Sequence, residues 1–150
     1  MRIFNLTILS WFGSGYSPKA PGTAGSLAAL PFAWIIATTW GPLSLLLAGL
    51  IAFGIGWVAA NASPEAQKDP GWVVIDEVAG QWLTLAIVPP DVLLYAIGFL
   101  AFRVFDIFKP WPIRTLEQKV PGALGVMIDD VAAAVYAGAV LYIATLILGS

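Results

Sequence analysis

Long apolar runs alternate with short turns and polar linkers along most of this chain. The runs from Ala24 to Trp40 and from Leu43 to Ala60 contain 17 and 18 residues, close to the ~20 that an α-helix needs to cross a bilayer. Gly41 and Pro42 lie between them, which predicts a turn and therefore a transmembrane hairpin. A last apolar run of 18 residues extends from Val131 to Leu148.

Two shorter apolar segments lie between these runs. The segment from Asp76 to Val88 has 13 residues, only ~20 Å of helix against a hydrocarbon core of ~30 Å. It predicts either a helix that begins near Trp72 or a partly inserted hairpin. Pro89-Pro90-Asp91 turns the chain, and the segment from Val92 to Phe105 returns it. The pattern predicts an all-α, polytopic membrane bundle of about five apolar helices, forming one domain over residues 1–150.

The first 26 residues are more ambiguous. Residues 1–13 resemble the core of a signal peptide, but a short helix at the membrane interface is the interpretation we favour. The segment from Gly13 to Ser26 contains four glycines and two prolines and cannot be helical throughout. With Lys19 beside it and Thr23 as a helix N-cap, it can cradle a phosphate. The alternative is a flexible lead-in with a lysine that reaches the membrane surface.

Composition places the chain in a membrane and excludes several chemistries. The sequence is 59% hydrophobic and 11% charged, whereas soluble domains have about 25% charged residues. The net charge of −2 gives no basis for binding nucleic acid. The absence of Cys and His excludes thiol nucleophiles, phosphohistidine and Ser-His-Asp triads. Any chemistry must therefore use carboxylates, Lys, Arg, hydroxyl groups and a hard metal ion.

The charged residues concentrate in one stretch. Residues 103–130 hold eight of the sixteen charged residues of the chain and predict a polar loop between apolar helices. Asp129-Asp130 is expected to begin the last helix, as Asp76-Glu77 begins an earlier one, because the N-terminus of a helix favours negative charge. Two acidic doublets with basic residues between them predict a site for a divalent metal ion and phosphate at a membrane surface.

Four segments resemble, in order and spacing, the motifs of the phosphatidylglycerophosphatase A family. They are GSGYSPKAPGTAGS (13–26), VVIDEVAGQW (73–82), FRVFDIFKPWPI (102–113) and PGALGVMIDD (121–130). The resemblance implies an Mg²⁺-dependent phosphatase of the bacterial cytoplasmic (inner) membrane. Its substrate would be a phospholipid in the bilayer, phosphatidylglycerophosphate, whose terminal phosphate is removed to give phosphatidylglycerol.

The resemblance also implies which residues form the site. The candidate catalytic residues are Asp76, Glu77, Asp106, Asp129 and Asp130, with the four doublet acids as metal ligands and Gln81 in support. The candidate phosphate-binding residues are Lys19, Thr23, Arg103 and Lys109. Two positions depart from the family pattern: Ala134 replaces an expected glycine, and no histidine precedes Asp76, so a linker histidine cannot be the acid or base here.

Other interpretations remain open at this point. The acids can be solvated helix caps in a structural subunit, or an ion pathway in a small ion- or proton-coupled transporter. Within the phosphatase interpretation, direct attack by water, with Asp106 as the base, competes with a phosphoaspartyl intermediate. The number of metal ions and the oligomeric state do not follow from the sequence.

The distribution of cations predicts the topology. With a cytoplasmic N-terminus, all seven fall on the cytoplasmic side, where positive residues accumulate: Arg2, Lys19, Lys68, Arg103, Lys109, Arg114 and Lys119. We therefore expect the site to face the cytoplasm. Reporter fusions after Ser63 and Lys119 should read cytoplasmic, and fusions after Pro90 and Ser150 external. An external reading after Lys119 would contradict the model of a shared cytoplasmic face.

Overall fold

The chain folds as an all-α protein. In the computed structural model, which describes residues 1–149, there are seven α-helices and two 3-10 helices, and no strand occurs in that range. The elements in chain order are α1 (Arg2–Leu9), η1 (Ser14–Tyr16), α2 (Pro21–Trp40), α3 (Pro42–Asn61), η2 (Ala66–Lys68), α4 (Ile75–Leu85), α5 (Val92–Phe108), α6 (Ile113–Lys119) and α7 (Gly122–Leu148).

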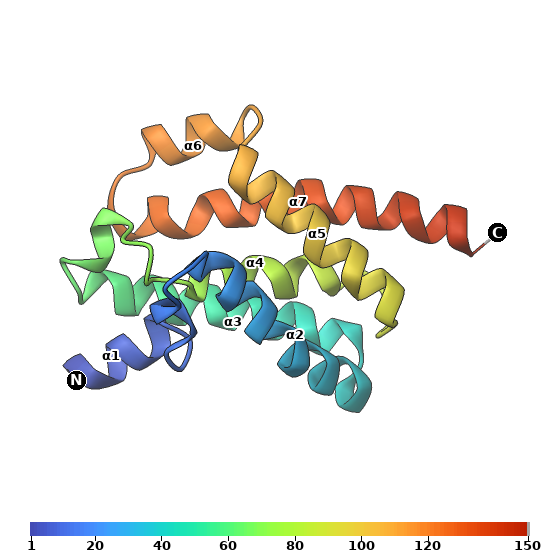
Figure 1. Cartoon of the computed structure of the whole chain (residues 1–150), viewed down its shortest axis with the longest axis horizontal. Helices are drawn as coiled ribbons and strands as arrows, with labels where there is room; N and C mark the ends of the chain where they lie inside the picture. The colour runs from blue at the N-terminus through green and yellow to red at the C-terminus, as the bar shows by residue number, and fades with distance from the viewer. Residues whose placement is uncertain (150) are drawn as a thin grey trace.

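Three of the described helices, α2, α3 and α7, are long and apolar enough to cross a membrane. Figure 1 shows that the α2–α3 and α4–α5 turns lie at the same end of the molecule as the C-terminal end of α7. The N-terminus, η2 and α6 lie toward the other end. The cation-bearing linkers therefore gather at one end of the bundle, as the sequence predicts.

Helix α4 is the centre of the bundle. It packs against α2, α3, α5 and α7, and nine of its eleven residues are buried. Two of its polar side chains donate hydrogen bonds to backbone carbonyls. Trp82 Nε1 donates to the Ala29 carbonyl of α2 at 2.9 Å, and Thr84 Oγ1 donates to the Gly80 carbonyl of α4 at 2.9 Å. Because α4 is surrounded by helices, acids on its first turn are held inside protein.

Glycine allows the neighbouring helices to approach α4 closely. A Cβ on Gly80 would lie 2.6 Å from the Phe102 ring of α5 and 3.0 Å from the Asp130 carbonyl of α7. A Cβ on Gly56 of α3 would lie 2.8 Å from the Met127 side chain of α7. The small-residue face predicted on α3 is confirmed, since Gly56 and its neighbours Ala52 and Ala60 are buried.

Several predicted boundaries are wrong. Residues 1–149 form seven α-helices, among them the expected short N-terminal helix α1, and three are long and apolar enough to cross a membrane, so the number of about five apolar helices is not confirmed. Part of the predicted polar loop folds as α6. Helix α7 begins at Gly122, so Asp129 and Asp130 lie in its third turn and are not at its N-terminus. Of the two alternatives for the segment from Asp76 to Val88, a helix that begins near Trp72 is wrong, since α4 begins at Ile75, with Asp76 and Glu77 in its first turn.

The predicted capping role of Thr23 is wrong as well. Helix α2 begins at Pro21, its N-cap is Ala20 in a left-handed conformation, and no side chain caps it. A proline at the first helical position suits a helix start, because its missing N–H needs no partner there. The predicted α2–α3 hairpin is confirmed, with the turn at Gly41, where φ is +89°. Ser150, at which one predicted fusion is placed, lies outside the described residues.

The close approach at Gly80 gives a testable prediction. We expect Gly80→Ala to destabilise the protein by about 1–3 kcal/mol, the usual effect of overpacking, because Phe102 is fully buried and the Asp130 carbonyl belongs to a helix backbone. Thermal unfolding in detergent measures the loss. Gly54→Ala is the matched control, since a Cβ there meets nothing within 4 Å. Equal melting temperatures for the two variants would contradict the packing argument.

Candidate active site

Three helices bring most of the predicted site residues together in one polar volume. The first turns of α4 supply Asp76, Glu77 and Gln81, the end of α5 supplies Arg103 and Asp106, Lys109 follows as the C-cap of α5, and the third turn of α7 supplies two acids. We call the five carboxylates the acidic cluster: Asp76, Glu77, Asp106, Asp129 and Asp130. The four aspartates are at most 7% exposed, and the Glu77 side chain is 14% exposed.

Two cations join the carboxylates of different helices. Lys109 Nζ lies 2.6 Å from Asp129 Oδ2 and 3.3 Å from Asp106 Oδ1, so it connects α7 with α5. Arg103 forms an ion pair with Asp106, and its Nη1 lies 3.8 Å from Glu77 Oε1 of α4. Asp106 therefore contacts both cations and holds them over the centre of the site.

The N-terminus of α2 closes one side of the site. A Cβ on Gly22 would lie 2.3 Å from Glu77 Oε1 and 3.1 Å from Arg103 Nη2. Only glycine leaves room for these side chains so near the α2 backbone. The first turn of a helix presents unpaired N–H groups and a positive dipole end, which here lie beside a carboxylate.

The charges of the site do not balance. Five carboxyl groups share two cations, and within residues 1–149 Asp76 and Asp130 form no ion pair. Burial lowers the pKa of Lys109, but the nearby carboxylates of Asp129 and Asp106 raise it by more, and the pKa lies above the usual lysine value. Lys109 is therefore a permanent cation at neutral pH, and it cannot act as a general base.

The remaining negative charge fits a divalent metal ion. Carboxylate oxygens of Asp76, Glu77 and Asp130 lie within 4.8 Å of one another, as do those of Asp106, Asp129 and Asp130. Each acid of the first group has one buried oxygen without a hydrogen-bond partner in residues 1–149. Buried polar atoms almost always have partners, so these oxygens are suited to a hard cation such as Mg²⁺. Asp130 belongs to both groups.

Some predicted site residues are not placed in this volume. Lys19 is exposed in the loop before α2, and within residues 1–149 its ammonium forms no ion pair. Thr23 lies in the first turn of α2, next to Gly22, and has no side-chain contact to the acidic cluster among the described interactions. Gln81, by contrast, follows Glu77 by one turn of α4 and is fully buried, and its two amide atoms have no hydrogen-bond partner within residues 1–149.

Two residues of α2 near the site were not among the predicted site residues. Gly22 borders Glu77 and Arg103, and Ser26, one turn later on the same helix face, is fully buried with an unpartnered hydroxyl. The only signal for either was their place in the first family-like segment. Neither residue type carries a charge, and burial cannot be seen in the sequence.

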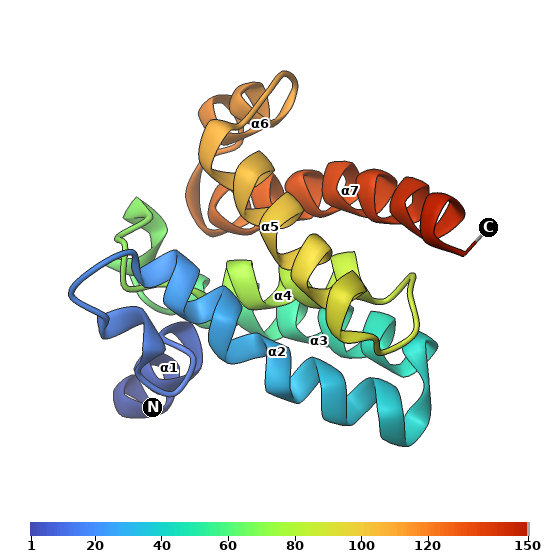
Figure 2. The ribbon, with the colours of Figure 1, turned by 45° about the vertical axis from the view of Figure 1, so that its right-hand side comes forward.

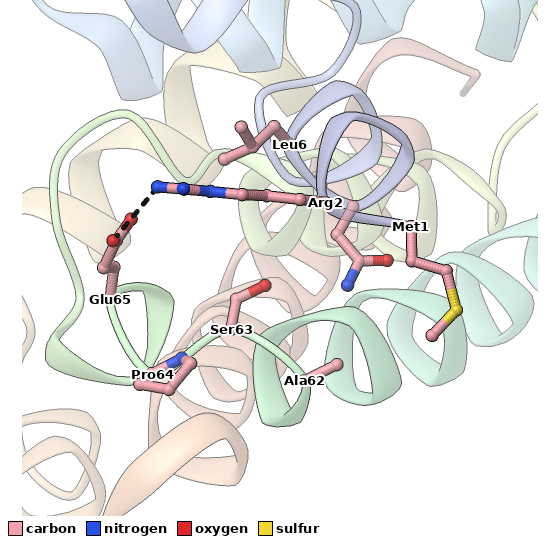
Figure 3. A pocket seen from close by; sticks show the side chains of 8 residues that line it. Met1, Arg2, Leu6, Ala62, Ser63, Pro64 and Glu65 are labelled. Carbon is pink, nitrogen blue, oxygen red and sulfur yellow. Dashed lines mark hydrogen bonds and ion pairs between the residues drawn. The ribbon is translucent and has the colours of Figure 1, made fainter.

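A separate cavity lies outside the site. About 380 Å³ of space lies between α1 and the linker after α3, where an exposed ion pair joins Arg2 to Glu65 at 3.4 Å (Figure 3). It is lined by Met1, Leu6 and the linker residues Ala62 to Glu65. None of the acidic cluster lines it, so it is not the centre of the chemistry.

Comparison with known proteins agrees with this geometry. The family model for phosphatidylglycerophosphatase A matches residues 7–145. Phosphatidylglycerophosphatase A of Escherichia coli (strain K12) is 43% identical over 134 residues, which cover 87% of this chain and 77% of the relative. The Haemophilus influenzae (strain Rd) protein of the same name is 37% identical over 134 residues, covering 87% and 82%.

A third relative has a different name. A Bacteroides thetaiotaomicron protein, provisionally named a phosphatidylinositol-3-phosphatase, is 38% identical over 151 residues, covering 92% of this chain and 91% of its own. No solved structure matches the chain.

The charge imbalance predicts how metal affects stability. In EDTA, Asp130→Asn should be at least as stable as wild type, because the change removes one of five crowded charges and keeps the side-chain shape. At a hundredfold excess over Kd, Mg²⁺ should stabilise the wild-type protein by about 2.7 kcal/mol and so raise its melting temperature. The melting temperature of the variant should rise much less. Thermal unfolding in detergent, with and without Mg²⁺, measures both.

Asp91→Asn is the control for this experiment. Asp91 caps α5, accepting from Leu94 N at 2.9 Å, and lies in the α4–α5 turn, away from the cluster. Asparagine caps helices as well as aspartate, so the response of this variant to Mg²⁺ should match that of wild type. A large loss of stability in Asp130→Asn in EDTA would show that Asp130 makes a structural contact instead.

Proposed function

Because this chain belongs to the phosphatidylglycerophosphatase A family, we propose that it hydrolyses the terminal phosphomonoester of phosphatidylglycerophosphate, releasing phosphatidylglycerol and phosphate. The reaction would use Mg²⁺ and take place at the cytoplasmic face of a bacterial inner membrane. The observation that carries this proposal is the acidic cluster itself: five carboxyl groups that share two cations, at the end of the bundle that holds the polar linkers.

We assign the metal to the shared carboxylate and its neighbours. Asp130 with Asp76 and Glu77, and Asp130 with Asp106 and Asp129, form the two groups that could hold a cation. When bound, Mg²⁺ would polarise a phosphoryl oxygen and lower the pKa of a water molecule. Gln81, buried beside Glu77 with a free amide, is placed to orient a ligand or a water by hydrogen bonding.

Arg103 and Lys109 would bind the substrate phosphate. Both are partly buried and held by carboxylates, and a guanidinium can donate two parallel hydrogen bonds to phosphate oxygens. Lys19 is exposed at the entrance to α2, where a flexible cation can attract an anionic headgroup before it enters the site.

The position of Asp106 favours a different role from general base. Its two carboxylate oxygens are engaged by Arg103 and Lys109, so neither is free to accept a proton from a water molecule. We assign Asp106 to positioning the two cations. Proton removal from the attacking water then belongs to a carboxylate without an ion pair, and Asp76 has a buried oxygen with no partner.

A phosphate-release assay tests the function. Purified protein in detergent micelles should release phosphate from phosphatidylglycerophosphate with Mg²⁺ and stop in EDTA. Asp130→Asn should reduce turnover by roughly a hundredfold or more, because a preorganised charge at a reacting centre is typically worth on the order of 10²–10³ in rate. Asp91→Asn should keep wild-type turnover.

The substrate panel should include phosphatidylinositol 3-phosphate, since one relative has that assignment in its name. A preference for that lipid would change the proposed substrate and would leave the proposed site residues unchanged. Full turnover of Asp130→Asn at ordinary Mg²⁺ would remove Asp130 from the site, and no phosphate release from any lipid would contradict the proposed function.

A further inference from the structure

An apolar groove of about 500 Å³ lies between α2 and α5. The two helices run alongside each other across the same side of α4 (Figures 1 and 2). It is lined by four residues of α2 and three of α5: Leu27, Leu30, Pro31, Trp34, Val92, Tyr95 and Ala96. Apart from the Tyr95 hydroxyl and the Trp34 indole N–H, these side chains carry no polar group, so the groove suits an apolar occupant.

The groove continues the side of the acidic cluster that α2 closes. Gly22 borders Glu77 and Arg103, and Leu30 lies eight residues, or ~12 Å, further along α2. Along α5, in the opposite direction, Tyr95 lies eight residues and the same ~12 Å from Arg103. The two helices that border the charged site therefore also form the walls of the apolar groove, at one common distance from it.

An aromatic contact closes the inner wall of the groove. The Trp34 and Tyr95 rings meet edge to face, with centroids 5.3 Å apart, and Tyr95 OH donates to the Ala33 carbonyl at 3.5 Å. Pro31 lies inside α2 and provides no N–H for the carbonyl one turn earlier. These contacts fix the shape of the wall, because both aromatic side chains are held by the opposite helix.

Another apolar groove of the bundle has a volume of about 380 Å³ and is bordered by α3, α4 and α7. Its lining includes Leu50, Leu83 and Val131. Toward the polar end, α3 and α7 are in close contact, since a Cβ on Gly56 would lie 2.8 Å from the Met127 side chain. That contact closes the space between α3 and α7 at the polar end of this groove, although Val131, which follows Asp130, lines it.

We propose that the α2–α5 groove holds an acyl chain of the phospholipid substrate while its phosphate lies in the acidic cluster. This inference rests on the proposed function, and it identifies the part of the lipid that the polar site cannot bind. A lipid chain is already in apolar surroundings in the bilayer, so the groove contributes van der Waals contact and orientation instead of hydrophobic transfer. Its effect would be to place the phosphomonoester at the carboxylates.

Ala96→Trp tests the groove by filling it. Ala96 is exposed on the groove wall, so a larger side chain can be accommodated without entering the protein core. We expect kcat/KM on long-chain phosphatidylglycerophosphate to fall by about 10- to 100-fold, the usual effect of a misplaced substrate. Hydrolysis of an acyl-free glycerol ester with the same phosphomonoester should change less than about twofold, because orientation by the chain no longer matters.

Leu93→Trp is the matched control. Leu93 lies three residues before Ala96 on the same helix, is 54% exposed and does not line the groove. The Leu93→Trp variant should therefore hydrolyse both substrates at wild-type rates. An equal loss on both substrates in Ala96→Trp would indicate damage to the site and overturn the proposal. Unchanged rates on both would also overturn it.

A binding measurement separates this inference from the proposed activity. The chain has no cysteine, so a fluorophore can be attached to Ala96→Cys or Leu93→Cys alone, in the Asp130→Asn background. A nitroxide on the acyl chain of phosphatidylglycerophosphate should quench the label at position 96 more than the same chain on phosphatidylglycerol does, and position 93 should show no such difference.

Each other outcome has a distinct meaning. Equal quenching at position 96 by both lipids would identify ordinary bilayer lipid and overturn the proposal. A disulfide between two Ala96→Cys chains that displaces the lipid would identify a second copy as the occupant and overturn it too. Phosphate-dependent quenching without turnover in wild type would support the groove and contradict the proposed function.

Discussion

Five carboxyl groups that share only two cations, held inside an apolar helical bundle, are the constraint on which the rest of this structure depends. Isolated buried charges are strongly unfavourable, and pairing relieves the cost only when the geometry is good. Lys109 and Arg103 relieve part of it by joining carboxylates of different helices. A divalent cation bound at Asp130 would offset two more charges, so metal binding and stability of the bundle end would be linked.

The helices around the site meet this constraint by close approach of their backbones. Helix α4 is too short to span a bilayer, yet it is almost fully buried, and its acids lie where three neighbouring helices meet. Gly22 and Gly80 remove the side chains that would otherwise separate α4 from α2, α5 and α7. Carboxylates on helices are held more rigidly than carboxylates on loops. The carboxylate oxygens are therefore held at fixed distances from one another, as the binding of a small cation requires.

The sequence predicted the long helices and most of the site, because apolar run length and charge position are local properties. It did not predict α6 or the true start of α7, since residues 113–128 contain charges and glycines that also occur in loops. Asp130 was therefore expected at the start of a helix, where a carboxylate can serve as a helix cap. It lies in the third turn of α7 instead. Ser26 and Gly22 were missed because tertiary packing alone brings uncharged residues to a site.

The depth of the carboxylates also bears on whether the bundle moves ions or performs chemistry at its surface. Helix α7 has 27 residues, about 40 Å of helix and longer than the ~30 Å hydrocarbon core. Asp130 lies eight residues from its start, and the following 18 residues, about 27 Å, nearly suffice to span the core alone. The acids can therefore lie at the membrane boundary, whereas an ion pathway requires polar groups near mid-bilayer. A phosphate headgroup also lies at that boundary, so its phosphomonoester can reach the carboxylates while its chains stay in the hydrocarbon.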